Sequence, residues 1–286
     1  MKALITGASS GMGRDMAFYL ALLGYDVILV ARREQRLKEI AREINSKDGG
    51  QAFYVECDLS KRKECVRLYK LVKGEKIDLL INNAGFGYHG YFSEIPLSKE
   101  LEMIETNIAS VHILTKLFLK DMMKRNRGQI LNVASSAGFL PGPMLNTYYA
   151  TKNYVLRFSE GIYEELRRQG SAVKISVLCP GPVKTEFDKV AHVNFSLSGL
   201  ESEAVAKYAI DQTLKGKLVI IPGITMKVGL FFRRFVSEKI LLKVSYNIQK
   251  RKSLTSIGNN HRILAFFLYY AEYLFKNSLF LLTTVT

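Results

Sequence analysis

Short apolar runs alternate with helix-length amphipathic stretches over most of the chain. The apolar runs are mostly unbroken Ile, Leu and Val, which is typical of strands covered on both faces. Repeated alternation of strand and helix predicts an α/β fold with a doubly wound parallel sheet of about seven strands and right-handed crossovers. The expected strands are residues 2–6, 26–31, 52–56, 77–82, 129–134, 173–178 and 218–221, and the expected helices are 11–23, 34–44, 61–72, 99–124, 147–168 and 202–214.

The size of the chain suits one large domain followed by an extension. Of its 286 residues, 48% are hydrophobic, which is enough for one sizeable α/β core. The strand and helix pattern ends near residue 222, so we expect one domain over residues 1–222. Residues 223–286 are then predicted to form a basic, hydrophobic helical extension.

The cysteines and histidines give no sign of a metal site. Cys57, Cys65 and Cys179 and the four histidines are scattered without metal-type spacing. Scattered cysteines are typical of buried thiols in a reducing compartment. The chain opens directly with a strand, without room for a secretory signal peptide. We therefore expect a cytoplasmic protein that holds no metal ion.

A glycine-rich loop, TGASSGMG, joins the first strand to the first helix over residues 6–13. Gly7 permits a sharp turn, Gly11 lets the backbone approach a pyrophosphate, and Gly13 lets the helix pack close to the sheet. The helix N-terminus supplies N–H groups for the phosphates. Glycine triplets alone are weak signals, but the strand before and the helix after favour a dinucleotide site in a Rossmann-like fold. The alternative is an ordinary tight turn.

The second strand is followed by Arg32 and Arg33, near the place where NAD-binding proteins of this architecture usually carry an acid. A guanidinium there would bind a 2′-phosphate well. We therefore expect NADP(H) in preference to NAD(H). The alternative is that both arginines lie in solvent at the start of the next helix. Arg14, just inside the first helix, is a further phosphate candidate.

Two polar turns follow the third and fourth strands. Asp58 could accept a hydrogen bond from the adenine amino group, or it could lie in the N-cap region of the next helix, because Ser60 follows. The turn Asn82-Asn83-Ala84-Gly85 lies at the carboxyl edge of the predicted sheet. Such amides can hold a turn together and flank a cofactor.

Tyr148 and Lys152 stand four residues apart on a predicted helix, downstream of Ser135 and Ser136. Four residues are about one helical turn, so both side chains project from one face. A lysine ammonium beside a phenol favours the phenolate, which would lower the pKa of the tyrosine. Such a tyrosine can exchange a proton with a carbonyl or alcohol oxygen.

In this order, the motifs resemble those of the short-chain dehydrogenase/reductase family, over about residues 1–222. Only Tyr148, and not Tyr149, has a lysine four residues later, and the family's serine usually lies thirteen residues before that tyrosine, which selects Ser135. The resemblance implies a catalytic tetrad of Asn107, Ser135, Tyr148 and Lys152.

The resemblance also implies a role for each residue of the tetrad. Tyr148 would be the general acid or base, and Lys152 would lower its pKa and bind the nicotinamide ribose. Ser135 would hold the substrate oxygen, and Asn107 would anchor a water that links Lys152 to solvent. Thr185 would touch the nicotinamide carboxamide. The residues expected at the cofactor are Gly7, Ser9, Ser10, Gly11, Met12, Gly13, Arg32, Arg33, Asp58, Leu59, Asn83, Ala84, Gly85, Tyr148, Lys152, Pro180, Gly181, Val183 and Thr185.

Beyond the expected domain, the chain is basic and apolar. The formal net charge is +15, and residues 226–252 carry eight Lys or Arg and one acid. The mixture of apolar and basic residues in 228–248 suits a helix on an anionic bilayer, although it could instead cover the substrate cleft or pack on a second subunit. Residues 263–282 contain Glu272, Lys276 and Asn277, so we expect an interfacial or packed helix rather than a spanning one.

The combined motifs predict an NADP(H)-dependent oxidoreductase that interconverts a carbonyl and an alcohol on a small, hydrophobic molecule. Contact with a membrane surface through residues 226–282 and a homo-oligomer are further expectations, and nucleic acid is not expected because no reader motif accompanies the basic charge. The alternatives are a reductase of lipid or acyl ketones at a membrane surface and a non-catalytic NADP(H)-binding sensor. Residues 186–199 are a candidate lid. Apolar residues expected near the substrate are Phe86, Tyr88, Phe139, Leu140, Met144 and Phe195.

Overall fold

The computed structural model describes residues 1–187, 191 and 199–254. Its centre is a seven-stranded sheet in the order β3-β2-β1-β4-β5-β6-β9, in which every neighbouring pair is parallel. The predicted doubly wound sheet is therefore confirmed. Its strands are β1 (Lys2–Thr6), β2 (Asp26–Ala31), β3 (Ala52–Glu56), β4 (Leu79–Asn82), β5 (Gln129–Val133), β6 (Lys174–Leu178) and β9 (Val219–Ile220).

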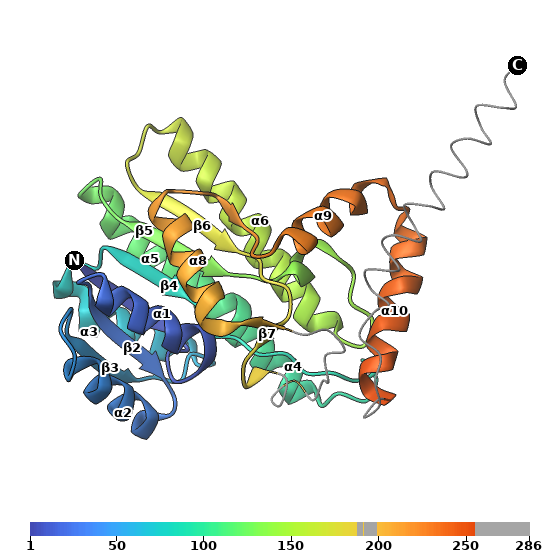
Figure 1. Ribbon diagram of the computed structural model, residues 1–286, viewed down its shortest axis with the longest axis horizontal. Helices are drawn as coiled ribbons and strands as arrows, with labels where there is room; N and C mark the ends of the chain where they lie inside the picture. Colours follow the sequence, from blue (N-terminus) through green and yellow to red (C-terminus); the bar gives the residue numbers. More distant parts are fainter. Residues whose placement is uncertain (188–190, 192–198, 255–286) are drawn as a thin grey trace, which may run out of the picture.

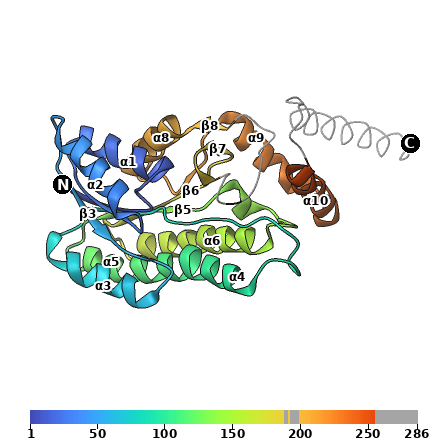
Figure 2. The same ribbon diagram turned by 90° about the horizontal axis from the view of Figure 1, so that it is seen from below.

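Helices cover both faces of this sheet (Figure 2). One face carries α1 (Gly11–Leu22), α2 (Glu34–Asn45) and α8 (Ser202–Leu214), and the other carries α3 (Arg62–Val72), α5 (Ser110–Lys124) and α6 (Asn146–Arg168). Further helices are α4 (Leu97–Ile104), α9 (Ile224–Phe232) and α10 (Glu238–Leu254), with short turns η1 (Lys73–Glu75), η2 (Glu105–Ala109), η3 (Ser136–Phe139) and η4 (Arg233–Phe235).

Two hydrophobic cores lie on the two sides of the sheet. Within β1, Ile5 belongs to the core beneath α1 and α2, whereas Leu4 belongs to the core beneath α3 and α5. Alternate residues of a strand point to opposite faces, which explains why the strands are continuous apolar runs. Each fully buried aliphatic side chain of this kind stabilises the fold by about 1.5–3 kcal/mol.

The predicted helix 99–124 is interrupted by a π turn. The chain forms α4, then the π-helical η2, and then α5 without a break in direction. The wider turn directs the buried Asn107 toward the loop after β4, where its Nδ2 donates to the carbonyl of Phe86 at 2.9 Å. Such π turns recur at functional sites. The other boundaries agree to within two residues, and the last strand shortens from residues 218–221 to β9.

The order of the strands places a crevice at one edge of the sheet. β1 pairs with β2 on one side and with β4 on the other. The connection after β1 therefore runs toward β2, whereas the connection after β4 runs the opposite way, toward β5. Ligands of open α/β sheets bind outside the carboxyl ends of the strands at this point. The glycine loop after β1 and the turn after β4 both lie there. A small two-stranded sheet, β7 (Val183–Lys184) and β8 (Leu200–Glu201), follows β6 at the same edge.

The end of the described chain lies at the opposite end of the molecule from the N-terminus (Figure 1). There α9 and α10 continue the helical extension that the sequence predicts. The division of the chain at residue 222 stays a prediction. The expected helix over residues 263–282, Phe195 and most of the candidate lid lie outside the described residues.

Candidate active site

The glycine loop is built as the sequence predicts. Gly7 has φ +66°, in the left-handed region that favours glycine. A Cβ on Gly13 would lie 2.4 Å from the carbonyl oxygen of Gly7, so only glycine allows α1 to start this close to the loop. Asn83 joins the turn after β4 to the loop, because its Nδ2 donates to the carbonyls of Thr6 at 3.0 Å and Gly7 at 3.3 Å.

Arg33 faces the glycine loop. Its Nη2 donates to the Oγ atoms of Ser10 at 2.6 Å and Ser9 at 2.9 Å, and its Nε also donates to Ser9. Its Nη1 donates to Glu186, which also accepts from Arg36. Arg36 and Glu186 are absent from the predicted site. The only available signal was the spacing of Arg33 and Arg36, since residues three apart at the start of a helix share a face.

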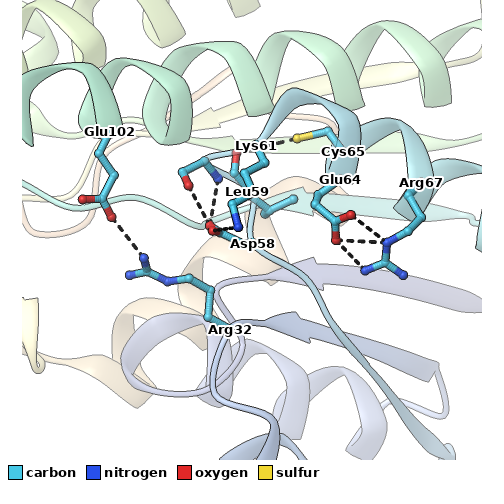
Figure 3. A network of polar contacts seen from close by, with 9 residues as sticks. Arg32, Asp58, Leu59, Lys61, Glu64, Cys65, Arg67 and Glu102 are labelled. Atoms are coloured by element: carbon cyan, nitrogen blue, oxygen red, sulfur yellow. Dashed lines mark hydrogen bonds and ion pairs between the residues drawn. The ribbon is translucent and has the colours of Figure 1, made fainter. Parts of the chain in front are cut away.

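Arg32 pairs instead with Glu102, as Figure 3 shows. Its Nη1 donates to Glu102 Oε1 at 3.0 Å, and its side chain is 62% exposed. Asp58 Oδ1 accepts from both the backbone N–H and the hydroxyl of Ser60, so it stabilises the turn before α3. Leu59 is buried in the core. Only the backbone of Leu59 is therefore available to a cofactor.

Two residues near the start of α1 have side-chain contacts within the protein. Met12 packs against the core. Arg14 lies over the ring of Phe18, 5.1 Å from its centroid, and its Nη2 is 3.8 Å from the carboxylate of Glu43. The interpretation of Arg14 as a phosphate ligand is therefore not supported.

The predicted pair on α6 lies on one face of the helix. Lys152 Nζ is 5.8 Å from the centroid of the Tyr148 ring and donates to the carbonyl of Val133 at 2.9 Å. A Cβ on Gly85 would lie 3.3 Å from Lys152 Nζ and 3.0 Å from Asn107 Oδ1. The Asn-Asn-Ala-Gly turn, the π turn and α6 thus meet at the lysine ammonium.

The hydroxyl of Ser135 belongs to the same group. It lies close enough to Tyr148 to lower the pKa of that phenol in part, and it accepts from the backbone N–H of Ala137 at 3.1 Å. The neighbouring Ser136 instead uses its backbone N–H to bind the carbonyl of Pro180 at 2.8 Å. The structure therefore brings Tyr148, Lys152, Ser135 and Asn107 together.

The expected lowering of the tyrosine pKa is wrong for this structure. Burial raises the pKa of Tyr148 well above its ordinary value, and the hydroxyl of Ser135 offsets only part of this. The half-buried phenol packs against Phe187, with ring centroids 5.3 Å apart. Burial also lowers the pKa of Lys152 to about 8.

The segment after β6 closes over the glycine loop. A Cβ on Gly11 would lie 3.0 Å from Thr185 Cγ2, so Thr185 approaches the loop backbone closely. Val183 is buried in β7. A Cβ on Gly181 would lie 2.5 Å from the end of the Met226 side chain. The segment after Pro180 therefore lies against both the glycine loop and α9.

The extension contacts this region through α10. Gln249 Nε2 donates to the hydroxyl of Tyr149 at 2.6 Å, and Ser245 Oγ donates to the carbonyl of Pro141 at 2.6 Å. Gln249 and Ser245 are buried. The sequence left several placements open for the basic helix. These two bonds place α10 against the start of α6 and the loop before it.

Two of the apolar residues expected near the substrate, Phe139 and Met144, have partners within the fold. Phe139 packs against the core of Val155 and Leu156, and Met144 is buried with a φ of +66°. Met144 holds the loop, because its carbonyl accepts from the N–H of Gly90 at 2.9 Å. These two residues therefore serve the core as well as the loop before α6.

In the part of the chain that the structure describes, no three His, Cys, Asp or Glu side chains gather as a metal ion requires. In the same residues, no helix combines the length and the apolar character needed to cross a bilayer. Cys57, Cys65 and Cys179 are buried free thiols.

Comparison with known proteins agrees with this geometry. The model of the family described as short chain dehydrogenase matches residues 1–194. The chain belongs to the short-chain dehydrogenase family. It is 36% identical over 198 residues to the very-long-chain 3-oxoacyl-CoA reductase of Anas platyrhynchos. That match covers 68% of this chain and 63% of the relative, so it spans less than two thirds of the relative's length.

Solved structures of the short-chain dehydrogenase family share the fold. A short-chain dehydrogenase/reductase from Burkholderia phymatum in complex with NAD has a TM-score of 0.75 and 26% identity, covering 85% of this chain and 94% of that one. A short-chain dehydrogenase from Sphingobium yanoikuyae in complex with NADPH has a TM-score of 0.74 and 25% identity, covering 91% and 99%. One of these relatives binds NAD and the other NADPH.

Proposed function

We propose that this member of the short-chain dehydrogenase family is an NADP(H)-dependent oxidoreductase that interconverts a carbonyl and an alcohol on a hydrophobic molecule. The observation that carries the proposal is the convergence of Tyr148, Ser135 and Lys152 beside the crevice, with Thr185 against the glycine loop. A proton donor and a dinucleotide site at one edge of a sheet are the two parts that carbonyl reduction requires.

The residues at the crevice fit a dinucleotide. The close approach of Gly13 to Gly7 leaves the N-terminus of α1 open to a pyrophosphate. Asn83 and Gly85 border the same space from β4. When bound, the nicotinamide supplies or accepts the hydride.

The protein's own groups handle the proton. The raised pKa of Tyr148 keeps its phenol protonated at neutral pH, which is the state that donates a proton to a carbonyl oxygen during reduction. The hydroxyl of Ser135, which acts on the pKa of Tyr148, would hold the same oxygen. Lys152, with a pKa of about 8, and Asn107 form the polar group on the other side of the phenol. We therefore favour reduction as the direction.

The preference for NADP(H) rests on Arg33. Its guanidinium binds Ser9 and Ser10 of the glycine loop, where a 2′-phosphate would find both charge and hydroxyl donors. Replacing Arg33 with Ala should weaken NADPH binding by about tenfold or more, the value of one charge-assisted contact, while NADH binding changes little. Arg32→Ala should have a smaller effect, because Arg32 pairs with Glu102. Equal losses for NADPH and NADH would overturn the preference.

The proposed substrate is an acyl ketone. A relative at 36% identity is named very-long-chain 3-oxoacyl-CoA reductase, and apolar side chains such as Phe187 lie at Tyr148. The test follows NADPH absorbance against 3-oxoacyl thioesters of increasing chain length, with steroid and aromatic ketones in parallel. We expect consumption to rise with acyl length. Absence of NADPH oxidation across the panel, despite NADPH binding, would favour the non-catalytic sensor instead.

A second candidate is the same reaction at a membrane surface. Phe231, Phe232 and Phe235 are exposed and lie together, with ring centroids 5.5–6.5 Å apart, beside Arg233 and Arg234. Aromatic rings with basic neighbours suit an anionic bilayer surface. Sedimentation with anionic vesicles should be lost when Phe231 and Phe235 are replaced with Ser. The cytoplasmic location and the homo-oligomer stay predictions.

A further inference from the structure

A carboxylate of the chain itself binds the guanidinium that the proposed function assigns to the 2′-phosphate. Glu186 Oε2 accepts from Arg33 Nη1 at 2.7 Å, and Glu186 Oε1 accepts from Arg36 Nη1 at 2.5 Å. Each guanidinium therefore binds one carboxylate oxygen in a charge-assisted hydrogen bond. These two bonds lower the pKa of Glu186 to about 2, so the carboxylate is ionised at neutral pH.

The donors around Glu186 are those that a phosphate would use. Arg33 binds Glu186 with one arm and the hydroxyls of Ser9 and Ser10 with the other. Arg36 adds a second guanidinium three residues later on α2. A phosphate has more charge and more acceptor oxygens than a carboxylate and binds such a group strongly. The same donors cannot bind both anions fully.

The neighbours of Glu186 hold it in this place. Thr185, before it, lies against Gly11 of the glycine loop. Phe187, after it, packs on the ring of Tyr148, and its backbone N–H binds Thr185 Oγ1 at 3.2 Å. Glu186 therefore meets the arginines because the segment after β6 is anchored on both sides of it.

We propose that Glu186 is a specificity-determining residue, which competes with the 2′-phosphate of NADP(H) for Arg33 and Arg36. This inference rests on the proposed function. NADP(H) has to displace the carboxylate, whereas NAD(H) lacks the 2′-phosphate and leaves the ion pairs in place. Glu186 therefore narrows the preference for NADP(H) over NAD(H).

The expected size of the effect follows from the exposure of the groups. The side chains of Arg33, Arg36 and Glu186 are 44%, 47% and 41% exposed, so solvent screens both ion pairs. Two exposed ion pairs are worth about three- to tenfold in an equilibrium constant. The competition should thus tune cofactor choice and not abolish binding of either dinucleotide.

The test measures the dissociation constants of NADPH and NADH for the full chain by titration. Glu186→Gln should lower the dissociation constant of NADPH by about three- to tenfold and leave that of NADH within about twofold. The matched control is Glu34→Gln. It removes the same charge next to Arg33, but from a carboxylate that pairs with Lys38. The control should bind both dinucleotides like the unmodified protein.

Three outcomes would overturn the inference, and they are distinguishable. If Arg33→Ala weakens NADPH binding but Glu186→Gln leaves the NADPH to NADH ratio unchanged, Glu186 does not compete and the proposed cofactor preference survives. If Arg33→Ala leaves NADPH binding unchanged, the 2′-phosphate site itself fails, and the inference fails with it. An equal gain in Glu34→Gln would show a general charge effect and also overturn the competition.

Discussion

The ammonium group of Lys152 donates a hydrogen bond to the carbonyl of Val133, 2.9 Å away, at the end of β5. This bond links α6 to the central sheet inside the protein, because Lys152 is 5% exposed. The lysine therefore lies beside Tyr148 and yet is held by the backbone of the neighbouring strand. Burial lowers the pKa of the lysine and raises the pKa of the phenol.

Tyr148→Phe should abolish most of the turnover and keep NADPH binding. The substitution removes only the hydroxyl that exchanges the proton, and general acid catalysis contributes about 10²–10⁴-fold. NADPH oxidation and NADPH titration together measure the two effects. Tyr149→Phe is the control, because it removes the same hydroxyl from the next residue, whose partner is Gln249. Retention of more than a tenth of the rate in Tyr148→Phe would contradict the assignment.

Lys152→Met should stabilise the fold at neutral pH, by an amount that shrinks as pH rises. The pKa of Lys152 falls from 10.5 to about 8 on folding, so the unfolded chain binds more protons between these values and stability increases with pH there. Below pH 8 the buried charge costs about 3 kcal/mol. The free energy of unfolding of both proteins, measured between pH 7 and 9.5, checks this. A difference that stays constant with pH would contradict a lowered pKa.

Gly13→Ala should be strongly destabilising, whereas Gly161→Ala should be slightly stabilising. A Cβ at residue 13 would lie 2.4 Å from the carbonyl of Gly7, and nothing lies within 4 Å of one at residue 161. Overpacking against backbone costs about 1–3 kcal/mol or more, while Ala in the interior of α6 gains about 0.5–1 kcal/mol over Gly. Chemical denaturation of both variants measures the sign of each change in the free energy of unfolding. Similar losses would rule out the close approach as the cause.

Gln249→Ala should loosen α10. It leaves the hydroxyl of Tyr149 without its hydrogen-bond donor, and an unsatisfied buried group costs about 1–3 kcal/mol. Hydrogen exchange of the amides of α10 should therefore quicken. Asn247→Ala is the control, because Asn247 is exposed on the same helix. Unchanged exchange in Gln249→Ala would show that this bond does not hold α10 in place.

Local patterns were sufficient to predict the architecture. The apolar runs and the glycine loop depend on periodicity and on backbone freedom, and the sheet order and the positive φ of Gly7 agree with both. The spacing of Tyr148 and Lys152 likewise determines that they share a face of α6, since one helical turn separates them. The π turn at Asn107 was not predicted, because its hydrogen bonds reach Phe86 and Thr151 on other elements.

Side-chain partners far apart in the chain were decided only by the tertiary structure. Glu186 is 150 residues from Arg36, and Gln249 is 100 residues from Tyr149. Neither pair leaves a local pattern, since each depends on how the segment after β6 and α10 pack. The tertiary structure also decided the pKa of Tyr148, because burial of the phenol disfavours its charged form. Local periodicity therefore determined which residues could form the site, and packing determined their partners and their protonation.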